Sequence, residues 1–245
     1  MHILGDTKLV KNHILNRYKW ICASNPLYLL THLINPLVIG ILGLVTVILS
    51  IFASVLDYFP GDIAVFNWVQ SFSTPWLDTT MQSISIFGDT IPQLIVSIAI
   101  LGIIFLTIGK LESVLFGFGI GTAFLLNKVL KFVIDRPRPD LPMMEVISKL
   151  DIGSFPSGHV MHMTVLVGIL TVLVYKNVSN KYFRMVLLIS FFNLWAGTGI
   201  SRIYLGVHWL SDVIGGFLWG ILALYLIFLG YKKTIHRRHD SSDSL

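Results

Sequence analysis

The sequence predicts an all-α, polytopic membrane protein, with six transmembrane helices in a bundle and a short amphipathic segment at the membrane interface. Of its 245 residues, 54% are hydrophobic and only 13% are charged. The mean hydropathy is +0.76, far above that of a soluble globular domain. The apolar residues gather in long runs, which is typical of a membrane protein. Because no stretch reads as a separate soluble unit, we expect residues 1–245 to form a single membrane-embedded domain.

Six segments are long and apolar enough to cross a bilayer, whose core of roughly 30 Å needs about 20 apolar residues in a helix. These segments are expected near Pro36–Leu56, Ile91–Ile108, Ser113–Ile134, Val160–Tyr175, Met185–Ile203 and Trp209–Tyr231. The third carries small residues suited to close helix packing, namely Gly117, Gly119, Gly121 and Ala123.

The region from Ala64 to Phe87 is neither long nor apolar enough to span the bilayer. It mixes aromatic residues such as Trp68 and Trp76 with glutamine, serine and threonine. An amphipathic element lying in the outer interface fits this mixture. A packed loop with aromatic anchors fits it equally well, because aromatic belts are common at membrane surfaces.

Loop charges predict the orientation of the bundle. Six spans place both termini on one side, together with the basic N-terminal segment 1–35 and the basic tail 232–245. The links on that side add further cations, namely Lys110, Lys176, Lys181 and Arg184. Such loops are typical of the cytoplasmic side, so we expect both termini in the cytoplasm, in a bacterial cell membrane. Orientation also accounts for the net charge of +5, and a nucleic-acid partner is not expected.

Three polar clusters fall on the opposite, outer side of the predicted bundle. Ionisable groups near membrane depth are costly, so they indicate function by default. The first cluster runs from Lys131 to Pro139. Lys131 and Arg138 are seven residues apart, so they would share a face if the helix continued for two turns. The alternative is a basic flank that reaches toward the interface, although such a flank on the outer side runs against the positive-inside tendency.

The second cluster leads directly into the fourth span and includes Ser157, Gly158 and His159. Ser157 is a good N-cap, and Gly158 lets a ligand approach the backbone. The first amides of the span could then bind phosphate. The alternative is a plain N-cap with an incidental histidine.

The third cluster contains Arg202, His208 and Asp212. His208 and Asp212 are four residues apart, so on a helix they face the same way. A carboxylate bound to one ring nitrogen fixes the tautomer and leaves the other nitrogen available for chemistry. The alternative is a capping pair.

Together the clusters supply what phosphoryl transfer needs: cations for the phosphoryl oxygens, a nucleophile and a proton for the leaving oxygen. The residues alone do not decide which histidine is the nucleophile.

The three motifs read K-x6-R-P from Lys131, P-S-G-H from Pro156 and S-R-x5-H-x3-D from Ser201. In order and spacing they resemble the type 2 phosphatidic acid phosphatase superfamily. The resemblance implies that His208 attacks phosphorus, that Asp212 orients it, and that His159 protonates the leaving oxygen and then activates water. It also implies a set of groups that bind the phosphoryl oxygens: Lys131, Arg138, Arg202, Ser157 and the Gly158 amide.

The implied activity is the metal-independent dephosphorylation of a lipid phosphate or diphosphate at the outer membrane face, through a phosphohistidine and without a cofactor. Polyprenyl diphosphate, phosphatidylglycerophosphate and phosphatidic acid stay open as substrates. One alternative is a lipid-phosphate or anion transporter, or a catalytically silent binder. Another is the same chemistry on a soluble phosphate ester.

A metal site is also conceivable from the sequence. Its ligands would be His159, His162, His208 and Asp212, but the neighbouring lysines and arginines would repel a divalent ion.

Overall fold

The computed structural model describes residues 35–139 and 153–242, and expectations for the remaining residues lie outside this part of the chain. Within it the chain is helical, without a strand. The helices are α3 (Pro36–Ala53), α4 (Pro60–Gln70), α5 (Pro75–Ile86), α6 (Thr90–Thr107), α7 (Lys110–Ile134), α8 (Gly158–Asn177), α9 (Lys181–Tyr204) and α10 (Leu210–Ser242).

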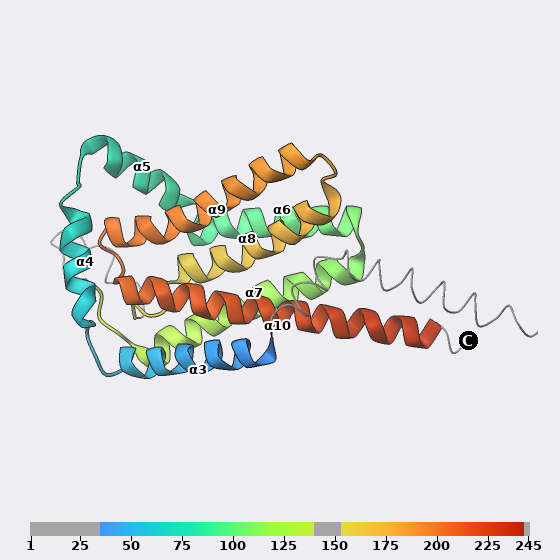
Figure 1. Ribbon diagram of the computed structural model, residues 1–245, viewed down its shortest axis with the longest axis horizontal. Helices are drawn as coiled ribbons and strands as arrows, with labels where there is room; N and C mark the ends of the chain where they lie inside the picture. Colours follow the sequence, from blue (N-terminus) through green and yellow to red (C-terminus); the bar gives the residue numbers. More distant parts are fainter. Residues whose placement is uncertain (1–34, 140–152, 243–245) are drawn as a thin grey trace, which may run out of the picture.

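Six of the described helices are long and apolar enough to cross a membrane, namely α3, α6, α7, α8, α9 and α10. They run along the long axis of the molecule (Figure 1). Many large apolar side chains point outward from them, for example Leu106, Phe118 and Leu125. In water so large an apolar surface would be unfavourable, whereas lipid accommodates it. The predicted six-span, all-α membrane fold is confirmed.

Several helices begin earlier than hydropathy predicts. Helix α9 begins at Lys181, where the side chain of Asn180 accepts hydrogen bonds from the amides of Tyr182 and Phe183. Helix α7 begins at Lys110 and not at Ser113. Helix ends follow capping and chain geometry, so polar residues can extend a helix beyond its apolar segment.

The region expected to be amphipathic forms two short helices, α4 and α5, and each has proline in its first turn, where a missing amide costs little. Helix α4 crosses one end of the bundle (Figure 1) and contacts α9 and α10, while α5 packs against α9. Trp68 on α4, Trp76 on α5 and Phe72 in the turn between them are exposed, as expected of aromatic anchors at an interface. The region is therefore helical and packed on the bundle, not an irregular loop.

Close packing between α8 and α10 aligns the ends of these two helices. A Cβ atom on Gly216 would lie 2.7 Å from the Ser157 carbonyl oxygen, and one on Gly220 would lie 2.9 Å from that of Met161. Only glycine permits so close a backbone approach. The N-terminal ends of α8 and α10 consequently lie side by side, each next to one of the polar clusters.

The small residues of α7 serve packing only in part. A Cβ atom on Gly119 would lie 2.5 Å from Ile227 of α10, and Ala123 is buried. Gly121, by contrast, has nothing within 4 Å of that position. The small residues of α7 therefore lie on two faces of the helix, one packed against α10 and one open.

Candidate active site

The three predicted clusters meet at the end of the bundle that α4 crosses (Figure 1). The C-terminal ends of α7 and α9 and the N-terminal ends of α8 and α10 supply them. An open pocket of about 440 Å³ lies there. Its lining includes five of the predicted site residues, namely Lys131, Gly158, His159, Arg202 and His208.

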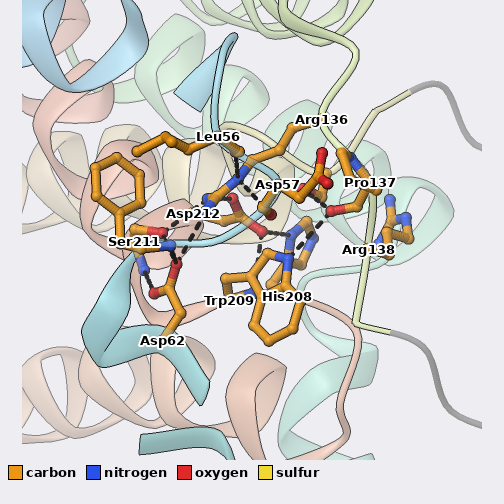
Figure 2. Close-up of polar contacts among 12 residues, drawn as sticks. Leu56, Asp57, Asp62, Arg136, Pro137, Arg138, His208, Trp209, Ser211 and Asp212 are labelled. Atoms are coloured by element: carbon orange, nitrogen blue, oxygen red, sulfur yellow. Dashed lines mark hydrogen bonds and ion pairs between the residues drawn. The ribbon is translucent and has the colours of Figure 1, made fainter. Parts of the chain in front are cut away.

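His208 and Asp212 form the predicted pair, but not on one helical face. Helix α10 begins only at Leu210, so His208 precedes it. The Asp212 carboxylate folds back across the helix start: its Oδ2 accepts a hydrogen bond from the Trp209 amide at 2.9 Å and lies 3.4 Å from His208 Nδ1 (Figure 2). The same carboxylate therefore caps the start of α10 and contacts the His208 ring, as its predicted orienting role requires.

The imidazole of His208 is buried and surrounded by positive charge. Burial lowers its pKa well below the ordinary value of 6.5, and the charges of Arg138, Lys131 and Arg202 lower it further. The ring is thus neutral at pH 7. Because Nδ1 faces a carboxylate, Nδ1 carries the proton, and the lone pair on Nε2 is left for chemistry.

Arg136 is a site residue that the sequence did not reveal. Its buried guanidinium donates to Asp212 Oδ1 at 2.7 Å and to Asp62 Oδ2 at 2.9 Å. Its Nε donates to the carbonyl oxygens of Leu56 and Asp57 at 3.2 and 3.1 Å (Figure 2). One arginine thereby holds the Asp212 carboxylate in place and connects it to α4.

Asp62 caps the start of α4 as Asp212 caps the start of α10, because each carboxylate accepts a hydrogen bond from a backbone amide just before its helix. It accepts a hydrogen bond from the Phe59 amide at 2.8 Å, one residue before α4 begins. It also accepts from the Ser211 amide at 2.9 Å and from the Ser211 hydroxyl at 2.6 Å. Two carboxylates at two helix starts therefore flank Arg136. Asp62, in a region without lysine or arginine between the first two spans, was the available sequence signal, but nothing in the sequence pairs it with Arg136.

His159 contacts a second carboxylate that the sequence did not reveal. Its Nε2 lies 2.8 Å from Oδ1 of Asp89, the residue before α6. Gly88 fits against the ring: a Cβ atom there would lie 2.3 Å from His159 Cδ2. The turn between α5 and α6 therefore seats His159, and the Gly-Asp pair just before an apolar span was the only sequence signal.

The three predicted cations, Lys131, Arg202 and Arg138, are held at the site by different contacts. Lys131 is buried, and its ammonium donates to the Gly153 carbonyl at 3.0 Å. Arg202 donates to the Ser85 hydroxyl. The helix does not continue for the two turns that would place Lys131 and Arg138 on one face, because α7 ends at Ile134 and Asp135 adopts a left-handed conformation with φ of 42°.

Arg138 lies instead on the segment that follows α7. Its guanidinium donates to the Val207 carbonyl at 2.8 Å, and the indole of Trp209 donates to the Pro137 carbonyl at 3.1 Å. These bonds hold the segment beside His208, although Arg138 does not line the pocket itself.

Ser157 stands before α8 but does not cap it with its side chain. Its amide donates to the Asp212 carbonyl at 3.0 Å, and its buried hydroxyl has no partner within the described ranges. Gly158 is needed for packing, because a Cβ atom there would lie 2.8 Å from Asn127 Oδ1. The phosphate-binding roles of both residues stay predictions.

In the part of the chain that the structure describes, no three histidine, cysteine or acidic side chains converge in a metal-binding arrangement. His162 stacks on Phe124 and contacts Gln93, and Asp212 is engaged by Arg136 and Trp209. The geometry does not support the alternative metal site.

Comparison with known proteins agrees with these motifs. The family model described as the PAP2 superfamily matches residues 112–235. Phosphatidylglycerophosphatase B of Bacillus subtilis (strain 168) is 36% identical over 166 residues, which are 66% of this chain and 79% of that protein. Lipid phosphate phosphatase delta of Arabidopsis thaliana is 30% identical over 128 residues, which are 47% of this chain and 29% of that protein.

Two solved structures are similar. The crystal structure of a transmembrane PAP2 type phosphatidylglycerolphosphate phosphatase from Bacillus subtilis aligns with a TM-score of 0.68 and 29% identity, covering 80% of this chain and 96% of that one. Aquifex aeolicus LpxE aligns with a TM-score of 0.51 and 24% identity, covering 72% and 99%, and shares the fold. The chain therefore belongs to the PAP2 superfamily and is an integral membrane lipid phosphatase.

Proposed function

We propose that this protein removes the terminal phosphate of a lipid phosphate or lipid diphosphate, without a metal ion, through a phosphohistidine on His208 at the extracytoplasmic face. The observation that carries this proposal is the state of His208. It lines the pocket, its Nδ1 faces the carboxylate of Asp212, and positive charge surrounds it.

In the first step, the lone pair on His208 Nε2 attacks phosphorus, and the bond from phosphorus to the lipid oxygen breaks. His159 gives its proton to the departing oxygen. Negative charge on the phosphoryl oxygens is stabilised by Lys131, Arg138 and Arg202. Ser157 and the Gly158 amide, at the N-terminal end of α8, add hydrogen bonds.

In the second step, His159 takes a proton from water, and the resulting hydroxide attacks the phosphorus of the phosphohistidine. The nitrogen–phosphorus bond breaks, inorganic phosphate leaves and neutral His208 returns. Asp89, 2.8 Å from His159 Nε2, suits both steps, because its carboxylate holds the ring and stabilises the imidazolium among three cations.

The position of the pocket suits a lipid substrate. It lies between the ends of α6, α7 and α8, whose outer faces are apolar. A headgroup can enter while its tails stay in lipid. The names of the Bacillus subtilis relatives favour a glycerophospholipid phosphate, and polyprenyl diphosphate and phosphatidic acid are further candidates.

Loop charge supports the extracytoplasmic side. At the far end of the bundle, the first turns of α7 and α9 carry Lys110, Lys181 and Arg184, whereas the α3–α4 and α4–α5 connections at the site end carry no lysine or arginine. Positive charge beside the ends of membrane spans is typical of the cytoplasmic side, and the cations at the site end belong to the polar clusters.

The test is release of inorganic phosphate by the purified protein in detergent containing EDTA. We expect activity to persist in EDTA and to fall by about 10³-fold or more in His208→Ala. His236→Ala, outside the three motifs, is the control and should match the wild type. An unchanged rate in His208→Ala would exclude this nucleophile, and movement of labelled lipid without phosphate release would indicate a transporter.

A further inference from the structure

The pocket has a deeper half that the proposed chemistry does not use. Gln93, Phe124, Lys128 and His162 line it, from α6, α7 and α8. Lys128 lies three residues before Lys131, and His162 lies three residues after His159. At 1.5 Å per residue, these side chains start about 4–5 Å farther from the bundle end than their reacting counterparts.

Lys128 places a positive charge within a membrane-spanning helix. Its side chain is exposed on the membrane-spanning helix α7, between the lipid-facing residues Leu125 and Val129. Its ammonium lies over the Phe124 ring, 5.8 Å from the centroid, and contacts no carboxylate within the described ranges. None of the residues that line the pocket is acidic. A charge at this depth is costly without a partner, so an anionic ligand would compensate it.

Gln93 and His162 add unsatisfied polar atoms to the same half of the pocket. Gln93 Oε1 lies 3.1 Å from His162 Nδ1, and the imidazole stacks on Phe124 with ring centroids 5.0 Å apart. These contacts fix both side chains. They leave Gln93 Nε2 and His162 Nε2 buried and without a partner in the described part of the chain. Such atoms are uncommon and costly, and a bound headgroup would supply the missing hydrogen bonds.

From this arrangement we infer that Lys128, His162 and Gln93 form a subsite for a second phosphate group, between the reacting phosphate and the lipid tail. The inference rests on the proposed function, which places the reacting phosphate at His208. Because the tail lies at bilayer depth, the atoms that join it to that phosphate pass the deeper half of the pocket.

Two kinds of lipid carry such a group: a lipid diphosphate, and a phosphodiester-linked headgroup with a terminal phosphate. Phosphatidic acid has a single phosphate and would leave the subsite empty. The subsite therefore favours lipids with two phosphates over lipids with one.

The test measures kcat/KM of Lys128→Met on three lipids in detergent micelles: a polyprenyl diphosphate, phosphatidylglycerophosphate and phosphatidic acid. Charge-assisted hydrogen bonds are strong, so we expect about a tenfold to hundredfold loss on at least one of the two-phosphate lipids. Phosphatidic acid should change by less than about twofold, and Lys128→Arg should recover most of the loss. The lipid that suffers the loss identifies the source of the second phosphate.

Lys110→Met is the matched control, because Lys110 lies on the same helix, outside the pocket, with its ammonium 5.8 Å from the Phe105 centroid. Equal losses on all three lipids, or no loss on any, would overturn the subsite. Binding of the same lipids to His208→Asn, with and without Lys128→Met, tests the subsite without turnover. A wild type that releases no phosphate but binds the two-phosphate lipids through Lys128 would contradict the proposed function and leave the subsite standing.

Discussion

Asp212 serves the fold and the proposed chemistry with different atoms of one carboxylate. Oδ1 accepts the hydrogen bond from Arg136, while Oδ2 accepts from the Trp209 amide and faces His208. The spacing of four residues predicted that His208 and Asp212 meet. It did not predict the fold-back across the helix start, which depends on where α10 begins. Arg136 could not be predicted, because its partners Asp62 and Asp212 lie 74 and 76 residues away in sequence.

The depressed pKa of His208 sets the acid side of the activity profile. A lowered pKa keeps the ring neutral until the pH falls below the ordinary value of 6.5, so kcat/KM should decline only below that pH. The need for a protonated His159 should lower kcat/KM on the alkaline side. We expect a bell-shaped profile, measured as phosphate release across the pH range. A profile flat between about pH 5 and 8, or an acid limb centred at or above 6.5, would contradict these roles.

A substitution at Gly88 tests whether the packing around His159 fixes the position of its ring. A methyl group at this position would lie 2.3 Å from His159 Cδ2, so Gly88→Ala must displace the ring or the turn. We expect kcat to fall about tenfold or more, because small displacements of a catalytic group are costly. Gly61→Ala, where nothing lies within 4 Å, should match the wild type. Full activity of Gly88→Ala would show that the position of His159 does not limit the reaction.

At the scale of elements, Arg136 connects the end of α7 to the starts of α4 and α10. It follows α7, binds the carboxylates at the starts of α4 and α10, and lies over the Phe59 ring at 5.1 Å. Its loss would leave Asp62 and Asp212 buried without their cation, and breaking such a pair is strongly destabilising. Helix α4 is therefore held at the site end by the same network that positions the orienting carboxylate.

Arg136→Met should lower the free energy of unfolding by about 3–5 kcal/mol, which thermal unfolding in detergent would report as a lower Tm. Arg184→Met is the matched control, since Arg184 also lies over a ring, 4.7 Å from the Tyr175 centroid, but is only half-buried. Equal Tm values for the two variants would show that the buried network does not hold the helices together.

For the whole molecule, hydropathy predicted the six spans, and the motifs predicted five of the residues that line the pocket. Both signals are local: the first depends on apolar runs, the second on short spacings. The structure added Asp62, Asp89 and Arg136, whose contacts join segments far apart in sequence. Hydropathy also could not show that residues 64–87 fold as two helices packed on α9 and α10.

Loop charge predicts which end of the bundle faces outward, and cysteine labelling tests it. In a Cys22→Ser background, Thr74→Cys lies in the exposed connection between α4 and α5, and Ser179→Cys lies in that between α8 and α9. A membrane-impermeant maleimide added to intact cells should label the first and not the second. The reverse pattern would place the site on the cytoplasmic side.

The central claim is that His208 carries the phosphoryl group. The most direct measurement is rapid quenching after addition of a lipid radiolabelled in its terminal phosphate, followed by mapping of labelled peptides. We expect acid-labile, alkali-stable label on the peptide that contains His208, and none in His208→Ala. Phosphate release without label on the protein, or label on His159, would contradict the account.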